Sequence, residues 1–244
     1  MNDDAPDAAP RPRRVHLSTS GLDAEIRSDE HGGHVLEIGG AVQSHVDLAA
    51  PQEIRYEYLR RMASVLDAVG EAGAALRVLH LGAGALTLPR YVAVRRPGSE
   101  QVVVDLDREL VSFVLASLPL PAGARVESRV ADAVDAVAAC AEAGERFDTV
   151  VLDVGTGDPG AQHLRGSDFY AALLGLVEPG GALVVNIGDD DGLEVLGAEI
   201  VALDWAADEG ELWTWAASDM LERLELGNAV LAVTLGGGAA GEGG

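Results

Sequence analysis

The feature that most constrains the fold is a repeated alternation of short apolar runs with longer helical patterns. The apolar runs lie at residues 76–81, 101–105, 125–130, 148–153 and 181–187. Strands that alternate with helices in this way pair in parallel, because each crossover helix returns the chain to the same end of the sheet. Helices cover both faces of such a sheet, so its strands are apolar along their whole length. The sequence therefore predicts an α/β fold with a mostly parallel sheet and helices on both faces.

Different patterns flank this core. Residues 21–50 hold short strand-like stretches broken by paired glycines, which predicts a small N-terminal β unit made of hairpins. A core domain is predicted over residues 51–235; it opens with a helical pattern at 51–69 and closes with an antiparallel pair, GELWTWAA and NAVLAVTL. Residues 1–20 are predicted to be a disordered tail, and residues 236–244 a flexible one.

Charge and cysteine content narrow the classes of partner. The net charge of -23 disfavours nucleic acid, which needs a basic face; it suits a cationic ligand, or it simply keeps the protein soluble. No apolar run is long enough to predict a membrane span. Cys140 is the one cysteine and lies in an apolar helical stretch, so we expect a buried thiol and a cytoplasmic protein.

A glycine-containing loop follows the first apolar run of the core. In VLHLGAGALTLPRYV, Gly82 and Gly84 allow the backbone to approach a ligand closely. The fingerprint of dinucleotide sites has a third glycine where this chain has Thr87, and that glycine serves helix packing under a pyrophosphate. We therefore expect a ligand without phosphates, such as S-adenosylmethionine or one of its derivatives.

Two acidic residues extend this prediction to a whole nucleoside. Asp105 ends the next apolar run, about twenty residues beyond the loop, where a carboxylate can accept hydrogen bonds from both ribose hydroxyls. Asp132 follows the third run; it could accept a hydrogen bond from an adenine amino group, or it could cap the helix that begins there. Because the carboxyl ends of parallel strands share one edge of the sheet, the loop and both acids are expected to form one site.

These segments together resemble the spermidine synthase family, the polyamine aminopropyltransferases, and especially the short spermidine-synthase-like proteins of high-GC bacteria. The likeness covers roughly residues 34–234 and is carried by HVLEIGGAVQS, FDTVVLDVGTGDP, SDFYAALLGLVEPGGALVVNI and GNAVLAV. It implies a class I methyltransferase-like, or Rossmann-like, fold. The strand-loop-helix core alone would also describe a general class I methyltransferase, so that alternative stays open.

The resemblance implies roles for individual residues on the nucleoside side. Gln43 matches a glutamine that contacts the nucleoside, and Asp105 matches the ribose-binding acid. Asp132 and Ala133 match the pair that contacts adenine. The implied co-substrate is decarboxylated S-adenosylmethionine or S-adenosylmethionine itself, with no metal.

On the acceptor side, the resemblance implies a small-molecule amine as substrate. Asp153 matches the catalytic aspartate; at the carboxyl end of its strand it could hold an ammonium and take its proton, or it could merely cap a turn. Tyr56 and Asp158 match substrate-binding residues. Amine attack needs such a proton acceptor, because a free alkylammonium has a pKa of about 10.

The acceptor side also departs from the family pattern. Ala85 stands where the family has an aspartate that grips the aminopropyl ammonium, and Tyr58 stands where a Tyr-x-Glu pattern has its acid. Asp158 follows Asp153 by five residues, where the family spacing is three. We therefore expect poor or absent activity with putrescine. A methyltransferase, and a non-catalytic relative that uses the fold for binding or assembly, are the alternative functions.

Two further groups of residues have simpler interpretations. His31, His34 and His45 are predicted to be ordinary surface residues of the N-terminal unit, because a metal site needs three or four converging ligands. Trp213 and Trp215 share one face of a strand, which predicts either core packing or a contact between subunits. We expect a homodimer.

Overall fold

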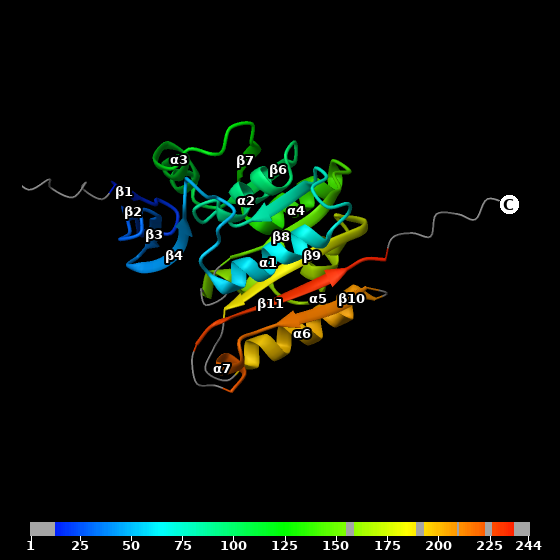
Figure 1. Cartoon of the computed structure of the whole chain (residues 1–244). Helices are drawn as coiled ribbons and strands as arrows, with labels where there is room; N and C mark the ends of the chain where they lie inside the picture. Colours follow the sequence, from blue (N-terminus) through cyan, green and yellow to red (C-terminus); the bar gives the residue numbers. More distant parts are fainter. Residues whose placement is uncertain (1–12, 155–158, 189–192, 209, 223–225, 237–244) are drawn as a thin grey trace, which may run out of the picture.

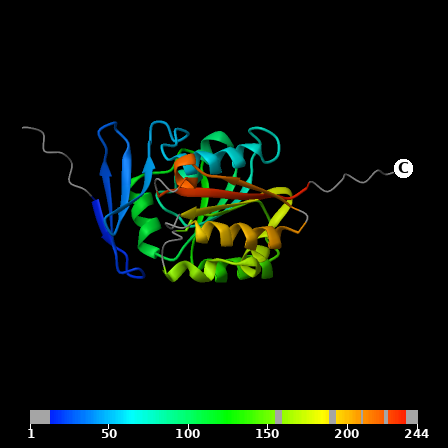
Figure 2. The same ribbon diagram turned by 90° about the horizontal axis from the view of Figure 1, so that it is seen from below.

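The computed structural model describes residues 13–154, 159–188, 193–208, 210–222 and 226–236. A seven-stranded sheet lies between two layers of helices, and a separate four-stranded antiparallel sheet stands beside it (Figures 1 and 2). The predicted α/β fold with an additional N-terminal β unit is confirmed. Within the described ranges, no helix is long and apolar enough to cross a membrane.

The large sheet has the strand order β10-β11-β9-β8-β5-β6-β7. Neighbours among β5, β6, β7, β8 and β9 run parallel, whereas β11 and β10 are antiparallel additions at one edge. All five strands of the predicted alternation and the closing antiparallel pair are present. Their bounds are β5 Arg77–Leu81, β6 Glu100–Asp105, β7 Arg125–Val130, β8 Phe147–Leu152, β9 Val177–Gly188, β10 Glu211–Trp215 and β11 Asn228–Thr234.

Helices cover the two faces of this sheet in separate layers. Three pack on one face: α1 Glu57–Ala68, α2 Thr87–Arg95 and α3 Arg108–Ser117. Three cover the other face: α4 Ala133–Glu142, α5 Ser167–Leu174 and α6 Glu194–Ala207. The short η1 Pro159–Leu164 and α7 Ser218–Leu221 complete the described elements. Cys140 of α4 is fully buried in the core, as predicted.

The small sheet consists of β1 Arg13–His16, β2 Asp23–Ser28, β3 His34–Ile38 and β4 Ala41–Val46 in sequential antiparallel order. The prediction of a disordered tail is wrong for residues 13–20, because β1 pairs with β2 and Leu17 is fully buried. Arg14 of β1 forms a cross-strand ion pair with Glu25 of β2. The predicted tails at 1–12 and 237–244 lie outside the described residues.

The helical pattern predicted from Pro51 begins later than expected. Residues 51–56 form turns and loop, and α1 starts at Glu57 with Tyr56 in an extended conformation before it. The reason lies in long-range contacts. The Arg55 side chain reaches back to Asp29 at the end of β2, and Ile54 is buried against α1. This segment therefore ties the small sheet to the core domain.

Candidate functional site

The glycine loop lies where β5, β6 and β8 end side by side. The Gly82 N–H donates to the Val104 carbonyl of β6, and the Asp153 N–H donates to the Leu81 carbonyl of β5, at 2.8 and 2.9 Å. Gly82 has φ +100°, and a Cβ there would collide with the Asp153 carbonyl oxygen. Glycine is therefore required at this position for close packing of the loop on Asp153.

The small sheet closes over the other side of this loop. The Ser44 Oγ of β4 accepts a hydrogen bond from the Ala85 N–H at 3.2 Å, and a Cβ on Gly84 would lie 2.7 Å from that oxygen. The Thr87 hydroxyl donates to the His45 carbonyl at 3.2 Å. The space that Gly84 leaves is thus filled by the protein, and the small sheet becomes one wall of the site.

Gln43 has a special position in that wall. In the register between β3 and β4, Leu36 faces Ser44 and Glu37 faces Val42, so Gln43 is the extra residue of a β-bulge. It is exposed to solvent. Bulges redirect a side chain out of the normal alternation, which suits the predicted contact of Gln43 with a nucleoside.

Asp105 is the last residue of β6 and is held by backbone donors on both oxygens. Its Oδ2 accepts from the Ala83 N–H of the glycine loop at 2.9 Å, and its Oδ1 accepts from the Asp107 N–H at 2.8 Å. Burial raises the pKa of Asp105, and the two N–H donors oppose that shift. Each oxygen keeps a lone pair for a ribose hydroxyl, so the carboxylate is oriented before any ligand arrives.

Asp132 caps α4, as one of its two predicted roles requires. Its Oδ1 accepts from the Val134 N–H at 2.8 Å, and buried Ala133 begins the helix. The other oxygen lies 2.8 Å from the His163 Nε2 of η1. Contact with adenine stays a prediction. His163 is a residue that the sequence did not single out, because it lies 31 residues from its partner.

An apolar pocket lies between η1 and the ends of β8 and β9. It is lined by Leu152, Val154, Ala161, Leu164, Arg165, Tyr170, Val185 and Ile187. Ala161 and Leu164 belong to the same short helix as His163.

Asp153 follows β8 directly and is the most perturbed acid at this edge of the sheet. Burial raises its pKa to about 6, although a hydrogen bond from the Asn186 side chain works against the shift. That bond joins the Asn186 Nδ2 to the Asp153 Oδ1 at 2.8 Å. A carboxylate with such a pKa is a stronger proton acceptor than an ordinary aspartate.

Asn186 is a candidate site residue that the sequence analysis missed. It lies near the end of β9 and is only 8% exposed, and its Oδ1 has no hydrogen-bond partner among the described residues. Leaving a buried polar atom unpaired costs about 1–3 kcal/mol. An N–H donor on a ligand would remove this cost. The signal in the sequence was a single polar residue in the apolar run ALVVNI.

Two tyrosines border the same place. Tyr56 precedes α1 and stacks on Tyr58, with ring centroids 6.5 Å apart and planes 10° from parallel. Burial raises the pKa of Tyr58, and the negative charge of Asp153 raises it further. Tyr58 is therefore close to Asp153, at the position where the family pattern has an acid. Asp158, the other predicted substrate contact, lies outside the described residues.

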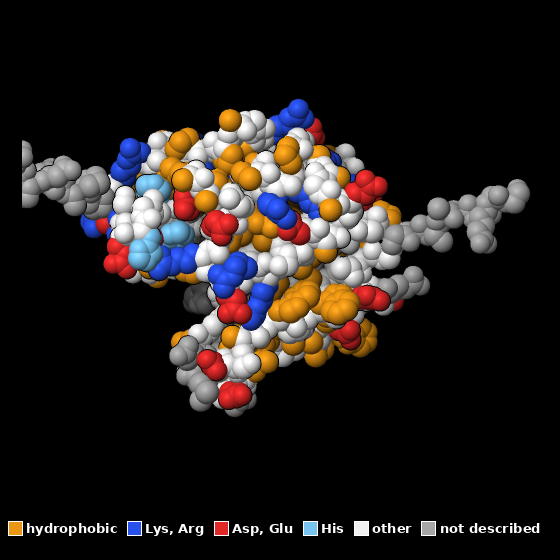
Figure 3. Space-filling view, viewed as in Figure 1, with side chains coloured by type: hydrophobic (Ala, Val, Ile, Leu, Met, Phe, Trp, Pro, Cys, Tyr) orange, Lys and Arg blue, Asp and Glu red, His pale blue; other side chains and the backbone are white. Residues whose placement is uncertain are grey.

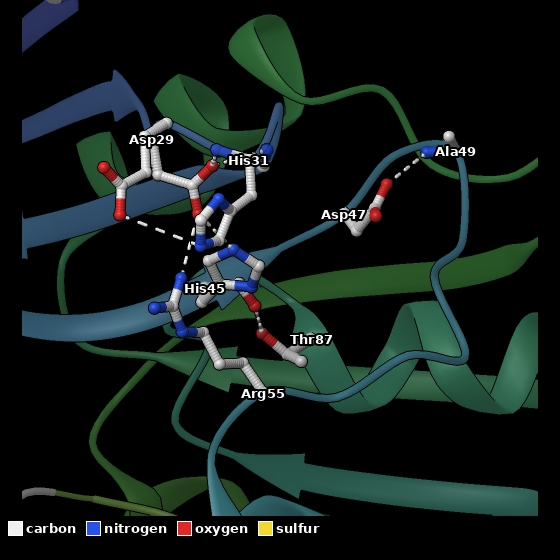
Figure 4. Close-up of polar contacts among 9 residues, drawn as sticks. Asp29, His31, His45, Asp47, Ala49, Arg55 and Thr87 are labelled. Carbon is white, nitrogen blue, oxygen red and sulfur yellow. Dashed lines mark hydrogen bonds and ion pairs between the residues drawn. The ribbon is translucent and has the colours of Figure 1, made fainter.

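The prediction that the histidines are ordinary surface residues is wrong for His45. Its Nε2 lies 2.9 Å from the Asp29 Oδ2, which also accepts from the Arg55 Nη1 at 3.0 Å (Figure 4). Burial works to raise the pKa of Asp29, but backbone donors at His31 and Gly33 and the His45 side chain outweigh it and lower the pKa to about 2. Among the residues described, no group of three metal-ligating side chains converges here or elsewhere.

Sequence comparison finds no protein-family model and no curated protein that matches this chain. Comparison with solved structures does find proteins of similar fold. A probable spermidine synthase from Corynebacterium glutamicum ATCC 13032 superposes with a TM-score of 0.80 at 28% identity, over 93% of this chain and 81% of that one.

Two more distant structures share the fold. A spermidine synthase in complex with the transition state analogue AdoDATO has a TM-score of 0.63 at 13% identity, over 93% of this chain and 73% of that one. Human methyltransferase-like protein 13 in complex with SAH has a TM-score of 0.62 at 19% identity, over 76% of this chain and 85% of that one. This chain thus has the fold of spermidine synthases and of S-adenosylmethionine-dependent methyltransferases.

Proposed function

We propose that this protein binds an S-adenosylmethionine-type nucleoside and transfers an aminopropyl group to an amine acceptor, with Asp153 as the proton acceptor. The observation that carries the proposal is the partly buried Asp153 carboxylate, whose pKa burial raises to about 6, directly beside the glycine loop. The similarity to the probable spermidine synthase of C. glutamicum, over 93% of this chain, supports aminopropyl transfer over other reactions of the fold.

The nucleoside would bind across the ends of β5, β6 and β7. Asp105 would accept hydrogen bonds from both ribose hydroxyls, and Gln43 would contact the nucleoside from the small sheet. Asp132 and the Ala133 N–H would contact the adenine, with His163 moving aside or holding the Asp132 carboxylate in place. The AdoDATO and SAH complexes of the structurally similar proteins support a nucleoside of this class.

The acceptor amine would sit beside the hydrogen-bonded pair of Asp153 and Asn186, within reach of the Asp153 Oδ2 and the Asn186 Oδ1. A protonated amine, with a pKa of about 10, cannot attack carbon; its ammonium would first pair with the Asp153 carboxylate and give up a proton to it. The free amine nitrogen then forms a bond to the aminopropyl carbon next to the sulfonium as the carbon–sulfur bond breaks, and methylthioadenosine leaves. The Asn186 Oδ1 would accept a remaining N–H and align the nitrogen.

The acceptor in this proposal is not putrescine. A diamine needs a carboxylate for each ammonium group, and this chain has Ala85 and Tyr58 at two of the positions where the family has acids. The uncharged Tyr58 hydroxyl next to Asp153, with its raised pKa, offers no replacement charge. We therefore propose an amine that is flanked by an apolar or aromatic group on the Tyr58 side.

A methyltransferase is the second candidate, and Ala85 favours it. Without an acid for the aminopropyl ammonium, the loop also places no negative charge against the carboxylate of intact S-adenosylmethionine. The fold of methyltransferase-like protein 13 is compatible with this reaction. A non-catalytic protein with the same nucleoside site would be the third outcome.

One experiment separates these functions. Purified protein is incubated with decarboxylated S-adenosylmethionine or S-adenosylmethionine and a panel of amines that includes putrescine, and the nucleoside products are separated. Methylthioadenosine formed with an amine other than putrescine supports aminopropyl transfer. Release of S-adenosylhomocysteine instead identifies a methyltransferase. Nucleoside binding by calorimetry without any turnover identifies a non-catalytic protein, and rapid turnover with putrescine refutes the proposed divergence.

A further inference from the structure

β10 forms an edge of the large sheet and lacks most of the features that protect edge strands from pairing with another chain. β10 lies at the end of the strand order, and within the described residues β11 is its one neighbour. The outer backbone groups of such a strand can pair with another strand, and natural edges usually carry charges, prolines or bulges that prevent this. β10 reads ELWTW, so its only charge is Glu211 at one end.

Both sides of this edge carry exposed aromatic residues. Trp213 faces Ala232 and Trp215 faces Val230 in the neighbouring strand, which places both rings on the face covered by α1. They are 49% and 37% exposed, so the prediction of core packing is wrong for them. Their rings stack with centroids 6.3 Å apart. On the α6 side, Trp205 is 79% exposed and Val201 58% exposed one helical turn before it.

The exposed apolar area is comparable to the largest apolar patch of a typical monomer, and such patches are often functional. Figure 3 shows hydrophobic side chains gathered where β10 and α6 lie in Figure 1. A tryptophan presents up to about 250 Å², so the three exposed fractions correspond to on the order of 400 Å² per protomer. A stable interface buries about 800 Å² on each partner. The tryptophans alone would supply roughly half of that, and the strand backbone and α6 the remainder.

The pattern of β10 is complementary to itself. In an antiparallel pair of two β10 strands centred on Thr214, each Trp213 would lie opposite Trp215 of the second copy. Cross-strand aromatic pairs stabilise a sheet. The same register places the two Glu211 side chains at opposite ends of the paired strands, so no like charges face one another. A two-fold axis perpendicular to the sheet keeps both tryptophan pairs on one face and both α6 helices on the other.

From these observations we propose that the protein forms a symmetric homodimer through antiparallel pairing of its β10 edges, with Trp205, Trp213 and Trp215 at the interface. The large sheet then continues from one protomer into the next. This assembly does not depend on the reaction proposed above. The net charge of -23 on each chain opposes association at long range, so added salt should strengthen the dimer by screening this repulsion.

The sequence provides an unusually specific probe, because these three residues are all the tryptophans of the chain. Tryptophan fluorescence and sedimentation equilibrium are measured together over a dilution series of the wild-type protein. We expect a blue shift of emission on concentration, with the same midpoint as the mass change and a lower midpoint at higher salt. A monomer at every concentration overturns the proposal, as does a dimer that forms without any change in emission.

Hydrogen exchange distinguishes edge pairing from other contacts. Exchange of the β10 backbone amides should slow at concentrations above the midpoint, whereas unchanged β10 exchange in a dimer overturns the strand pairing. Trp213→Glu should raise the dissociation constant at least about thirtyfold, as expected for a central tryptophan. The control is Val94→Glu at a 39% exposed apolar position on α2, which should leave it unchanged. Circular dichroism reports folding of each variant; an equally stable dimer of folded Trp213→Glu refutes the interface.

Discussion

The nucleoside half of the site (Asp105 and Asp132) and the acceptor half (Asp153 and Asn186) differ in how many of their side-chain oxygens accept hydrogen bonds from the protein. Both oxygens of Asp105 and both oxygens of Asp132 already have protein partners. At Asp153, the Oδ1 accepts a hydrogen bond from Asn186, and the Asn186 Oδ1 has no partner among the described residues.

This difference has an electrostatic consequence. Burial raises the pKa of Asp105 and of Asp153 alike, but two backbone N–H donors oppose the shift at Asp105 and a single amide opposes it at Asp153. A carboxylate held by fixed donors is suited to orient hydroxyl groups without changing its charge. A buried carboxylate with few donors is suited to take a proton. The comparison therefore assigns binding to Asp105 and Asp132 and the chemical step to Asp153, and four measurements test this assignment.

The largest expected effect is the loss of transfer in Asp153→Asn. Asparagine keeps the shape but cannot accept the proton, so turnover with the best acceptor should fall by about 10²- to 10⁴-fold while nucleoside affinity stays nearly unchanged. The measurement is methylthioadenosine formation together with calorimetric titration. Asp148→Asn is the control, since Asp148 binds the Arg77 N–H at the opposite end of the same strand. Equal turnover in the two variants would show that Asp153 is structural.

The same substitution should change stability in a pH-dependent way. The folded pKa of Asp153, about 6, lies above the value of about 3.9 for an unfolded aspartate. The stability linked to the protonated form is therefore fully present below pH 4 and is lost as pH rises through 6. Asp153→Asn should be more stable than wild type by about 2–3 kcal/mol at pH 7 and not at pH 4. Urea unfolding at both pH values measures this, and a difference independent of pH would contradict it.

Tyr58→Glu tests why the acceptor half departs from a diamine site. An acid at this position should add a charge-assisted hydrogen bond to a second ammonium group, worth about 1.5–3 kcal/mol. KM for putrescine should then fall by roughly 10- to 100-fold, measured against the neutral variant Tyr58→Gln. If both variants bind putrescine equally well, the missing charge is not what excludes the diamine.

The smallest effect is expected in the nucleoside half. Asp105→Ala should weaken binding of methylthioadenosine by about 1–3 kcal/mol, since the ribose hydroxyls lose their charged acceptor. Asp107→Ala is the control, because Asp107 instead accepts the Ser20 N–H of the small sheet. Calorimetric titration decides the outcome. Unaltered affinity in Asp105→Ala would show that the ribose does not bind at the end of β6.

The amino-acid pattern alone predicts the core strands, the helices between them and their order along the chain. Apolar runs of strand length, separated by helical patterns, require a parallel sheet because only that arrangement buries both faces of each strand. The position of the glycine loop and the placement of Asp105 and Asp153 at strand ends follow directly from this pattern. Local periodicity carries this information, since it depends on neighbours within one or two turns of the chain.

Which side chains meet depends on how distant segments pack in the folded protein. Asn186 reaches Asp153 because β9 lies next to β8, and His163 reaches Asp132 because η1 returns over the start of α4. The β1 strand likewise exists only because β2 and α3 cover it, although its own sequence is polar. Such contacts join segments about 30 residues apart. They depend on strand order and on the return of distant segments, and no local pattern in the sequence encodes either.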